Sequence, residues 1–496
     1  MIDVTRRQLF RTGAGLAAAA YLGFASDTEN AVRLVGGPDW NALRKRVKGG
    51  VFLPQDDGYR PAARVFNDLF NERTPAAVAL CADADEVKAC LETAARNRIP
   101  IAARSGGHSY AGYSAQNDAL MVNMTKANSV DVRADGTAVI GSGARLIDVY
   151  AELAKRGRSI PAGSCSSVGI AGLTLGGGLS VLNRKYGMTI DWVESIKVVT
   201  PDCRLRTASP TSEPELFWGL RGAGGGNFGI VTEFTFRTAP APETVTVIWG
   251  DPGGFAIPVS AHAQVLAAWL RWAPVERDEL WTFLRLNQNY CRLLGTYAGP
   301  KAEAQVLLER FYAEAGITAE QARLTFTEMS YGDAMLRYAG CALGDFPKCQ
   351  ADAKNTVGKH LGTSRMVEHT LDDATVAKVA ELCHTDPNVW VQFDPLGGSV
   401  LPNPRYDAAF PHRGAIADLQ IYAAAPNGRD AAAAAMAPVR DGLGELIGRG
   451  SYINYIDADQ QDWLQASYGK NVARLKSVAR RYDPHRILAF PQGITP

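Results

Sequence analysis

The chain has 496 residues, of which 46% are hydrophobic and 21% charged, and its formal net charge is +1 at pH 7. The near-neutral charge argues against a nucleic-acid-binding surface, and the ordinary composition excludes a disordered or fibrous chain. This length exceeds what one hydrophobic core usually covers, so two domains are expected. Glycine is abundant, at 49 residues, and it clusters at a few places, which indicates loops that meet a ligand.

The N-terminus carries paired arginines, Arg6 and Arg7, followed by a small and apolar stretch at residues 13–25. This pattern is typical of a twin-arginine export signal, which predicts a signal peptide over residues 1–25 and a periplasmic or extracellular protein. An anchoring helix is the alternative, but the apolar stretch is shorter than the roughly 20 residues that span a bilayer. No later segment is long and apolar enough, so no stable membrane insertion is expected.

Residues 26–72 are weakly patterned, with one short helix predicted at residues 40–47, and a regular succession of strands and helices is predicted from Pro75 onward. Strands are expected at residues 76–80 and 99–103, with a helix between them that begins after Asp83 or Asp85. Further strands are predicted at residues 119–124, 129–132, 137–141, 191–200, 204–207 and 230–237, and helices at residues 146–155 and from residue 215. Two prolines, Pro240 and Pro242, then mark a domain boundary.

Three glycine-rich turns, at residues 104–109, 163–178 and 222–229, each adjoin a predicted strand. Consecutive small residues allow positive φ and let the backbone approach a ligand closely. Their N–H groups can also point at an anion such as a pyrophosphate. A nucleotide cofactor lying along one groove formed by the three turns is therefore predicted.

Residues 243–450 change character, because strand-like runs alternate with alanine-rich helical stretches. Strands are predicted at residues 244–249, 280–285, 389–393 and 417–424, and helices at residues 261–272, 302–313 and 431–446. The alternation predicts an α/β layer with a sheet wall, and its aromatic content suits a face that binds a small-molecule substrate.

The eight cysteines are too few and too scattered for a disulfide scaffold. Cys341 and Cys349 are near enough in sequence to bridge in an oxidising compartment, although spacing alone does not establish the bond. Cys81 and Cys90 lie in apolar surroundings and are predicted core residues. No cysteine or histidine spacing indicates a metal site.

Four motifs carry a resemblance to a known family. They are R-S-G-G-H-S-Y at residues 104–110, G-S-C-S-S-V-G-I-A-G-L-T-L-G-G-G at residues 163–178, R-G-A-G-G-G-N-F-G-I-V at residues 221–231 and Y-I-N-Y-I-D at residues 452–457. In this order they resemble the berberine bridge enzyme-like group of FAD-linked oxidases in the vanillyl-alcohol oxidase superfamily.

The resemblance implies an α+β fold. A PCMH-type FAD-binding domain is expected at residues 60–241, and an α/β substrate domain with an antiparallel sheet covered by helices at residues 242–450. A C-terminal segment, residues 451–496, is expected to pack back on the FAD-binding domain.

The resemblance also implies that FAD is bonded twice, through His108 to a methyl carbon of the isoalloxazine and through Cys165 to the adjacent ring carbon. Val168 occupies the position where valine is associated with access of dioxygen to the reduced flavin. By themselves, these residues would more often be a loop histidine and two core side chains. The other cofactor-binding residues expected are Arg104, Ser105, Gly106, Gly107, Ser109, Gly163, Gly169, Gly172, Gly176, Gly177, Gly178, Asn227, Gly229, Ile230, Val231, Tyr452 and Asn454.

Tyr452 is expected to act as the catalytic base, with Gln420 and Tyr110 in the same active-site layer. Relatives place a tyrosine after the G-G-G sequence where this chain has Leu179, so the group that stabilises the Tyr452 phenolate is left open among Gln420, Tyr422 and Asp394.

The implied reaction is oxidation of a C–H bond next to oxygen or nitrogen in a sugar, alcohol or aromatic natural product, with O2 reduced to H2O2. A dehydrogenase that uses a quinone or protein acceptor and a flavin-bearing protein that sequesters an aromatic compound are the alternatives.

Overall fold

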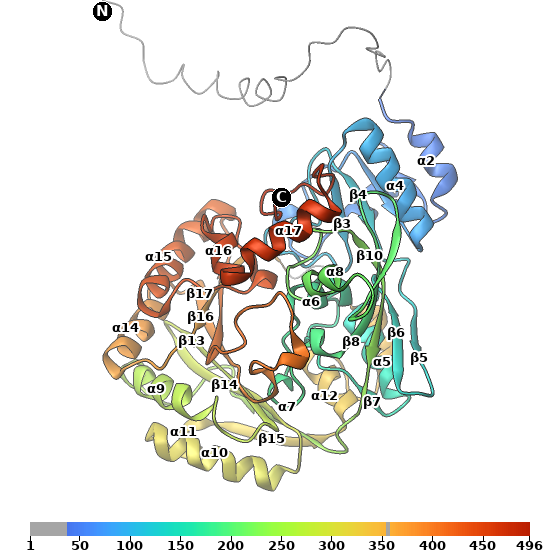
Figure 1. Cartoon of the computed structure of the whole chain (residues 1–496). Helices are drawn as coiled ribbons and strands as arrows, with labels where there is room; N and C mark the ends of the chain where they lie inside the picture. Colours follow the sequence, from blue (N-terminus) through green and yellow to red (C-terminus); the bar gives the residue numbers. More distant parts are fainter. Residues whose placement is uncertain (1–36, 354–357) are drawn as a thin grey trace, which may run out of the picture. The chain divides into compact units, whose positions relative to one another are not determined.

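The computed structural model describes residues 37–353 and 358–496 (Figure 1). The predicted signal peptide lies outside the described residues. Residues Trp40–Pro496 form one compact unit. Among the described helices, none is long and apolar enough to cross a membrane.

A small sheet begins this unit. Its strands, in spatial order, are β1 (Val51–Phe52), β2 (Ala77–Leu80), β4 (Leu120–Asn123) and β3 (Ile101–Arg104). The last three are parallel, and helix α4 (Ala84–Asn97) connects β2 to β3. Asp83 caps α4 by accepting hydrogen bonds from the backbone N–H groups of Asp85 and Glu86, both at 3.0 Å. The predicted strand, helix and strand are therefore confirmed, and Asp83 rather than Asp85 is the cap.

A five-stranded antiparallel sheet follows. Its strands, in spatial order, are β5 (Val130–Val132), β6 (Thr137–Gly141), β10 (Ile230–Arg237), β8 (Val193–Val199) and β9 (Leu205–Ala208). Helices α5 (Leu146–Ala154), α6 (Ile170–Gly176) and α8 (Pro214–Gly219) share its hydrophobic core.

Two predictions for this region are wrong in detail. The strand predicted at residues 191–200 begins only at Val193, because Asp191 belongs to a 3₁₀ turn, η2 (Thr189–Trp192), where its carboxylate accepts a hydrogen bond from the N–H of Met188 at 2.9 Å. The glycine run is also not turn throughout, because α6 forms inside it and buries Ile170 and Leu175.

A seven-stranded antiparallel sheet forms the larger part of residues 242–450. Its strands, in spatial order, are β15 (Leu324–Met329), β12 (Val245–Gly250), β14 (Tyr290–Tyr297), β13 (Leu280–Asn287), β17 (Val389–Pro395), β18 (Ala417–Ala424) and β16 (His360–Val367). One face packs against α9 (His262–Trp272), α10 (Lys301–Ala315), α14 (Asp373–Cys383) and α15 (Arg429–Ile447), which lie along the outside in Figure 1. The predicted helix-covered sheet is present, and sequence reasoning missed β14, β15 and β16.

The C-terminal segment contains η6 (Ile453–Tyr455), α16 (Trp463–Tyr468), η7 (Gly469–Asn471) and α17 (Val472–Tyr482). It contacts the third glycine-rich turn, since the Tyr468 hydroxyl donates to the carbonyl of Ala223 at 2.6 Å and the N–H of Ile494 donates to Oδ1 of Asn227 at 2.9 Å. These contacts tie the end of the chain to the predicted cofactor site.

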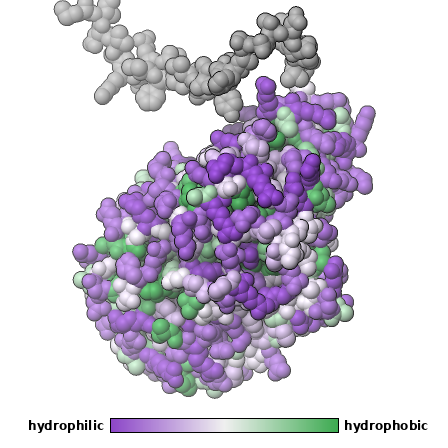
Figure 2. All heavy atoms as spheres, in the orientation of Figure 1, coloured by the Kyte–Doolittle hydropathy of each residue, from purple (hydrophilic) through white to green (hydrophobic). Residues whose placement is uncertain are grey.

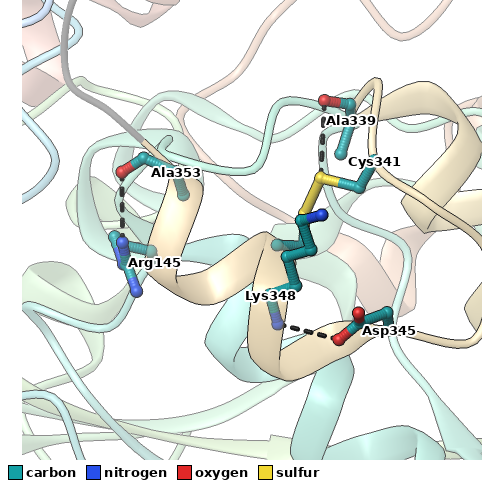
Figure 3. The surroundings of a disulfide bond; sticks show 7 residues. Arg145, Ala339, Cys341, Asp345, Lys348 and Ala353 are labelled. Atoms are coloured by element: carbon teal, nitrogen blue, oxygen red, sulfur yellow. Dashed lines mark hydrogen bonds between the residues drawn. A yellow bond between two sulfur atoms is a disulfide. The ribbon is translucent and has the colours of Figure 1, made fainter.

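A disulfide joins Cys341 and Cys349, whose Cα atoms are 5.6 Å apart (Figure 3). It links the loop after α12 (Tyr331–Tyr338) to α13 (Phe346–Asp352), a short helix capped by Asp345. The sequence spacing permitted this bond, and the structure forms it. Cys81 and Cys90 are buried and free, as predicted for core residues.

The remaining described elements are short. They are α2 (Trp40–Arg46), α3 (Tyr59–Ala63), η1 (Asp68–Phe70), β7 (Arg158–Ser159), α7 (Asn183–Tyr186), β11 (Ala239–Pro240), η3 (Val259–Ala261), α11 (Ala319–Ala322), η4 (Gly398–Val400) and η5 (Pro404–Tyr406). On the face shown in Figure 2, most surface residues are hydrophilic and the hydrophobic ones are scattered, as on an ordinary protein surface.

Candidate functional site

One cavity of about 680 Å³ is lined by all three glycine-rich turns and by the uncovered face of the seven-stranded sheet. The predicted cofactor residues that line it are Arg104, Ser105, Gly106, Gly107, His108, Ser109, Gly163, Cys165, Val168, Gly169, Gly172, Asn227, Gly229, Ile230, Val231, Tyr452 and Asn454. The predicted catalytic residues Tyr110, Gln420 and Tyr452 line it as well. Segments that are far apart in the sequence therefore meet at one site.

The first glycine-rich turn offers donors to an anion. The backbone N–H groups of residues 105–109 donate no hydrogen bond within the described part of the chain. Arg104 is buried beside them, and its Nε has no hydrogen-bond partner there. Burial lowers the pKa of Arg104 to about 10, so it keeps its charge at neutral pH. A buried cation and free N–H groups suit the pyrophosphate of a dinucleotide.

The second and third turns leave room for a flat ligand. A Cβ added at Gly172 would meet no atom within 4 Å, so open cavity lies in front of this backbone. Gly224 and Gly226 have φ of +80° and +81°, which glycine adopts without strain. Asn227 holds their turn in place by donating to the carbonyl of Ala223 at 2.8 Å. These residues fit FAD.

His108 and Cys165 both face this space. Nε2 of His108 lies 3.0 Å from the Ser167 hydroxyl, and the ring stacks on Phe66 with centroids 3.7 Å apart. Burial, with smaller effects of His360 and Arg104, lowers the pKa of His108 to about 3, so the imidazole is neutral and nucleophilic. The Cys165 thiol is exposed to the cavity, yet the surrounding walls desolvate it and raise its pKa.

Tyr452 is held at the start of the C-terminal segment with 2% of its surface exposed. Its oxygen accepts hydrogen bonds from the N–H of Gly178 at 2.8 Å and from Nδ2 of Asn454 at 2.9 Å. Burial raises the pKa of Tyr452, and hydrogen bonds from Gly178, Asn454 and the backbone of Leu179 oppose the rise. The backbone and Asn454 thus donate to the phenol oxygen, and sequence reasoning missed both as donors.

Gly176, Gly177 and Gly178 do not line the cavity, although they were expected to bind the cofactor. They let the C-terminal segment come close instead. A Cβ at Gly176 would lie 2.0 Å from Oδ1 of Asn454, and Gly177 and Gly178 have φ of +133° and +81°. Their role in the structure is to accommodate Tyr452 and Asn454.

Gln420 does not donate to Tyr452. Its Nε2 donates to the hydroxyl of Tyr110. The Tyr110 ring stacks on Tyr455 at 5.4 Å, and Tyr455 meets Tyr452 edge-on at 5.1 Å. Gln420 therefore positions an aromatic layer next to Tyr452.

Two carboxyl groups lie side by side on the sheet. Asp394 on β17 and Asp418 on β18 are direct cross-strand partners. Asp394 lines the cavity and accepts hydrogen bonds from Nε2 of Gln392 at 3.0 and 3.1 Å, and burial raises its pKa to about 6. Burial and the charge of Asp394 raise the pKa of Asp418 well above its usual range, so Asp418 is protonated. Asp418 and Gln392 gave no signal in the sequence.

An aromatic row covers the rest of the wall. Tyr422 stacks on Trp390 with centroids 4.5 Å apart and on His360 with centroids 4.6 Å apart. His360 was assigned no role from the sequence, because the spacing of the histidines indicates no metal site and β16 was not predicted. No group of metal-ligating side chains occurs in the described residues.

Comparisons with known proteins agree with this geometry. The FAD binding domain family matches residues 75–209, and the berberine and berberine-like family matches residues 451–495. Chitooligosaccharide oxidase of Gibberella zeae is 30% identical over 448 residues, which cover 85% of this chain and 87% of the relative. Glucooligosaccharide oxidase of Sarocladium strictum is 27% identical and covers 89% and 91% of the two chains.

Solved structures share the whole fold. BBE-like 1 of Physcomitrella patens has a TM-score of 0.84 at 25% identity, covering 91% of this chain and 98% of its own. A chitooligosaccharide oxidase has a TM-score of 0.84 at 27% identity, covering 92% and 99% of the two chains. The predicted fold class is confirmed. The chain belongs to the berberine bridge enzyme-like family and is an FAD-linked oxidoreductase.

Proposed function

We propose that this chain is an exported oxidase that removes a hydride from a C–H bond next to oxygen, or nitrogen, and passes the electrons to O2 to form H2O2. The observation that carries the proposal is the single cavity that joins the glycine-rich turns, Tyr452 and the aromatic wall. Among sugars, alcohols and aromatic natural products, the names chitooligosaccharide oxidase and glucooligosaccharide oxidase favour a sugar. Export is supported by the N-terminal sequence alone.

FAD, when bound, would supply the hydride acceptor. Arg104 and the free N–H groups of residues 105–109 would hold its pyrophosphate. His108 and Cys165 would bond to the isoalloxazine, because both line the same space and His108 is neutral. Two covalent links would keep the cofactor in place outside the cell.

Tyr452 would take the proton of the substrate hydroxyl. Its oxygen has two donors, Gly178 N–H and Asn454 Nδ2, and both favour the phenolate over the phenol. Since burial raises the pKa of Tyr452, the phenolate is a minor species at neutral pH, and we expect the rate to increase towards alkaline pH.

The experiment that tests the proposal is anaerobic mixing of the holoenzyme with a panel of saccharides and aromatic alcohols, followed by addition of air. We expect the flavin absorbance to bleach with a saccharide, then to recover quickly as H2O2 is released. Slow recovery in air would indicate a quinone or protein acceptor and would overturn the oxidase assignment. Tight binding without bleaching would indicate a binding protein.

The covalent links have a separate test. After acid precipitation of the holoenzyme, the yellow flavin should stay in the pellet, and proteolysis should release a flavin bonded to two peptides. Cys165→Ser should leave one linked peptide and His108→Ala the other. A colourless pellet from the unmodified chain would show that neither bond forms.

A further inference from the structure

Two arginines face the cavity from neighbouring strands of the seven-stranded sheet. Arg285 on β13 and Arg292 on β14 are direct cross-strand partners, and both side chains line the cavity. Like charges placed directly opposite each other on one face of a sheet destabilise it. A negative charge between them would relieve this repulsion.

The described part of the protein supplies little of that charge. Arg285 Nη2 donates to Oε1 of Gln392 at 2.6 Å, and Gln392 in turn donates to Asp394, so the link to a carboxylate runs through a neutral amide. Arg292 donates from Nε and Nη2 to the carbonyl of Gly250 at 3.2 and 2.9 Å. Neither arginine forms a salt bridge with a described residue.

Both guanidinium groups keep donors for a ligand. Nε of Arg285 is buried without a hydrogen-bond partner, and Nη1 of neither arginine has one in the ranges that the structure describes. Burial and the charge of Arg285 lower the pKa of Arg292, against opposing effects of Tyr290 and the exposed Asp251. Trp390 lies 4.1 Å from the Arg285 guanidinium, and this cation–π contact stabilises the cation without using its N–H groups.

We propose that Arg285 and Arg292 bind an anionic group of the substrate, a carboxylate or a sulfate ester, so that the substrate is an acidic saccharide. The proposal rests on the proposed function, since it names the substrate class of the same site. Guanidinium N–H pairs match two oxygens of either anion. Trp249, Trp281 and Trp390 line the same cavity and offer apolar faces to the C–H side of sugar rings.

The anion would lie away from the reacting carbon. Arg285, Gln392 and Gln420 are cross-strand partners in a row over β13, β17 and β18, and Gln420 bonds to Tyr110 in the catalytic layer. Two strand spacings are roughly 10 Å. This separation exceeds the width of one sugar ring, so the anionic group belongs to a ring next to the one oxidised.

The test compares three disaccharides on the holoenzyme: cellobiose, its analogue with a carboxylate in place of the non-reducing hydroxymethyl group, and its analogue with a sulfate ester on that group. Anaerobic flavin reduction at increasing sugar concentration gives Kd for each sugar, and steady-state turnover in air gives kcat/KM. We expect at least one anionic form to bind about 10-fold or more tightly than cellobiose, which is about 1.4 kcal/mol, because hydrogen bonds between two charged groups are stronger than those between neutral groups. The tighter anion identifies the group recognised.

Arg285→Gln and Arg292→Gln should each reduce this preference, mainly through KM. The matched control is Arg337→Gln, since the exposed Arg337 guanidinium lies 5.0 Å from the Trp249 ring and its side chain does not line the cavity. This variant should keep the preference. Equal affinity for all three sugars, or an equal loss in the control, would overturn the proposal.

A failure of the proposed function would be distinguishable. If no saccharide reduces the flavin, calorimetry with glucuronate and with inorganic sulfate still tests the anion site without turnover. Binding that is lost in Arg292→Gln would support the anion site, and no binding of either anion would reject it.

Discussion

At the scale of single residues, the site combines neutral and charged groups whose protonation depends on burial. His108 is neutral because burial lowers its pKa to about 3, whereas Arg104 keeps its charge despite burial. Tyr452 carries its proton at neutral pH, but its oxygen already accepts two hydrogen bonds. The local environment of each group therefore suits a different task, namely bonding, anion binding and proton acceptance.

Tyr452→Phe removes the proposed proton acceptor and keeps the ring. We expect kcat/KM to decrease by about 10²–10⁴-fold, the usual contribution of a general base, while the flavin stays bound. The increase in rate towards alkaline pH should disappear in this variant. Stopped-flow flavin reduction as a function of pH measures both effects.

Tyr455→Phe is the matched control, because it removes a hydroxyl from the same motif and keeps the ring that stacks on Tyr110. Its loss should be much smaller than that of Tyr452→Phe. Equal losses would indicate that the hydroxyls matter only for packing, and Tyr452 would then not be the base.

At the scale of elements, helix α6 and the glycines at its C-terminal end connect the two parts of the site. The N-terminal half of α6 carries Gly172, which faces the open cavity. Its C-terminal end at Gly176 touches Asn454, which holds Tyr452. Substitutions only four residues apart should therefore have different consequences.

Gly176→Ala should displace Asn454, because the new Cβ would lie 2.0 Å from its Oδ1. We expect a lower kcat with normal flavin content. Gly172→Ala, by contrast, creates no clash with described atoms and places a methyl group in the cavity, so flavin incorporation should decrease. The ratio of flavin absorbance to protein absorbance, together with kcat, separates the two, and identical effects would contradict this division.

At the scale of the whole molecule, the sheet that lines the cavity carries buried carboxyl groups that reduce the stability of the fold. Asp394 and Asp418 lie side by side among tyrosines, with Asp418 lacking any hydrogen-bond partner in the described residues. Together with Arg285 and Arg292, these carboxyl groups place desolvated polar groups in the cavity wall, which lowers the free energy of unfolding. Sites of this kind often trade stability for function.

The variant Asp394→Asn tests whether the buried carboxyl group makes the free energy of unfolding depend on pH. Because the folded pKa of Asp394 is raised to about 6, its contribution to stability is fully present below the unfolded value near 4 and is lost as pH rises through 6. The free energy of unfolding should decrease by roughly 3 kcal/mol over this range, because each pKa unit between the folded and unfolded values corresponds to about 1.4 kcal/mol. We expect urea unfolding of Asp394→Asn to lack this decrease between about pH 4 and pH 6.

Asp85→Asn is the control, because the pKa of Asp85 is shifted in the opposite direction to that of Asp394. Asp85 is exposed, and its hydrogen bond to Lys88 lowers its pKa, so its contribution is lost as pH falls rather than as it rises. If Asp394→Asn followed the same pH dependence as the unmodified chain, the carboxyl would not be buried as described.

Much of the cofactor region could be predicted from the sequence. The glycine-rich turns, the strand, helix and strand before them and the cap region of α4 depend on local backbone preferences, which single residues express directly. The same holds for the assignment of His108 and Cys165 to one site, since both lie within motifs. Strands β14 and β16 were missed because most of their side chains are buried on both faces, so their sequences show no regular alternation of polar and apolar residues. Strand β15 lies at the edge of the sheet and was missed although its exposure largely alternates.

The sequence by itself determined the family, the cofactor class and the place of Tyr452, because these are written in contiguous motifs. Only the tertiary structure decided which donors hold the Tyr452 oxygen, that Gln420 bonds to Tyr110, and that Arg285 faces Arg292. The first two contacts join segments far apart in the chain, whereas Arg285 and Arg292 lie on the two strands of one hairpin and face each other because of its register. Pairing of this kind depends on strand register and on the packing of three sheets, and no local pattern specifies either.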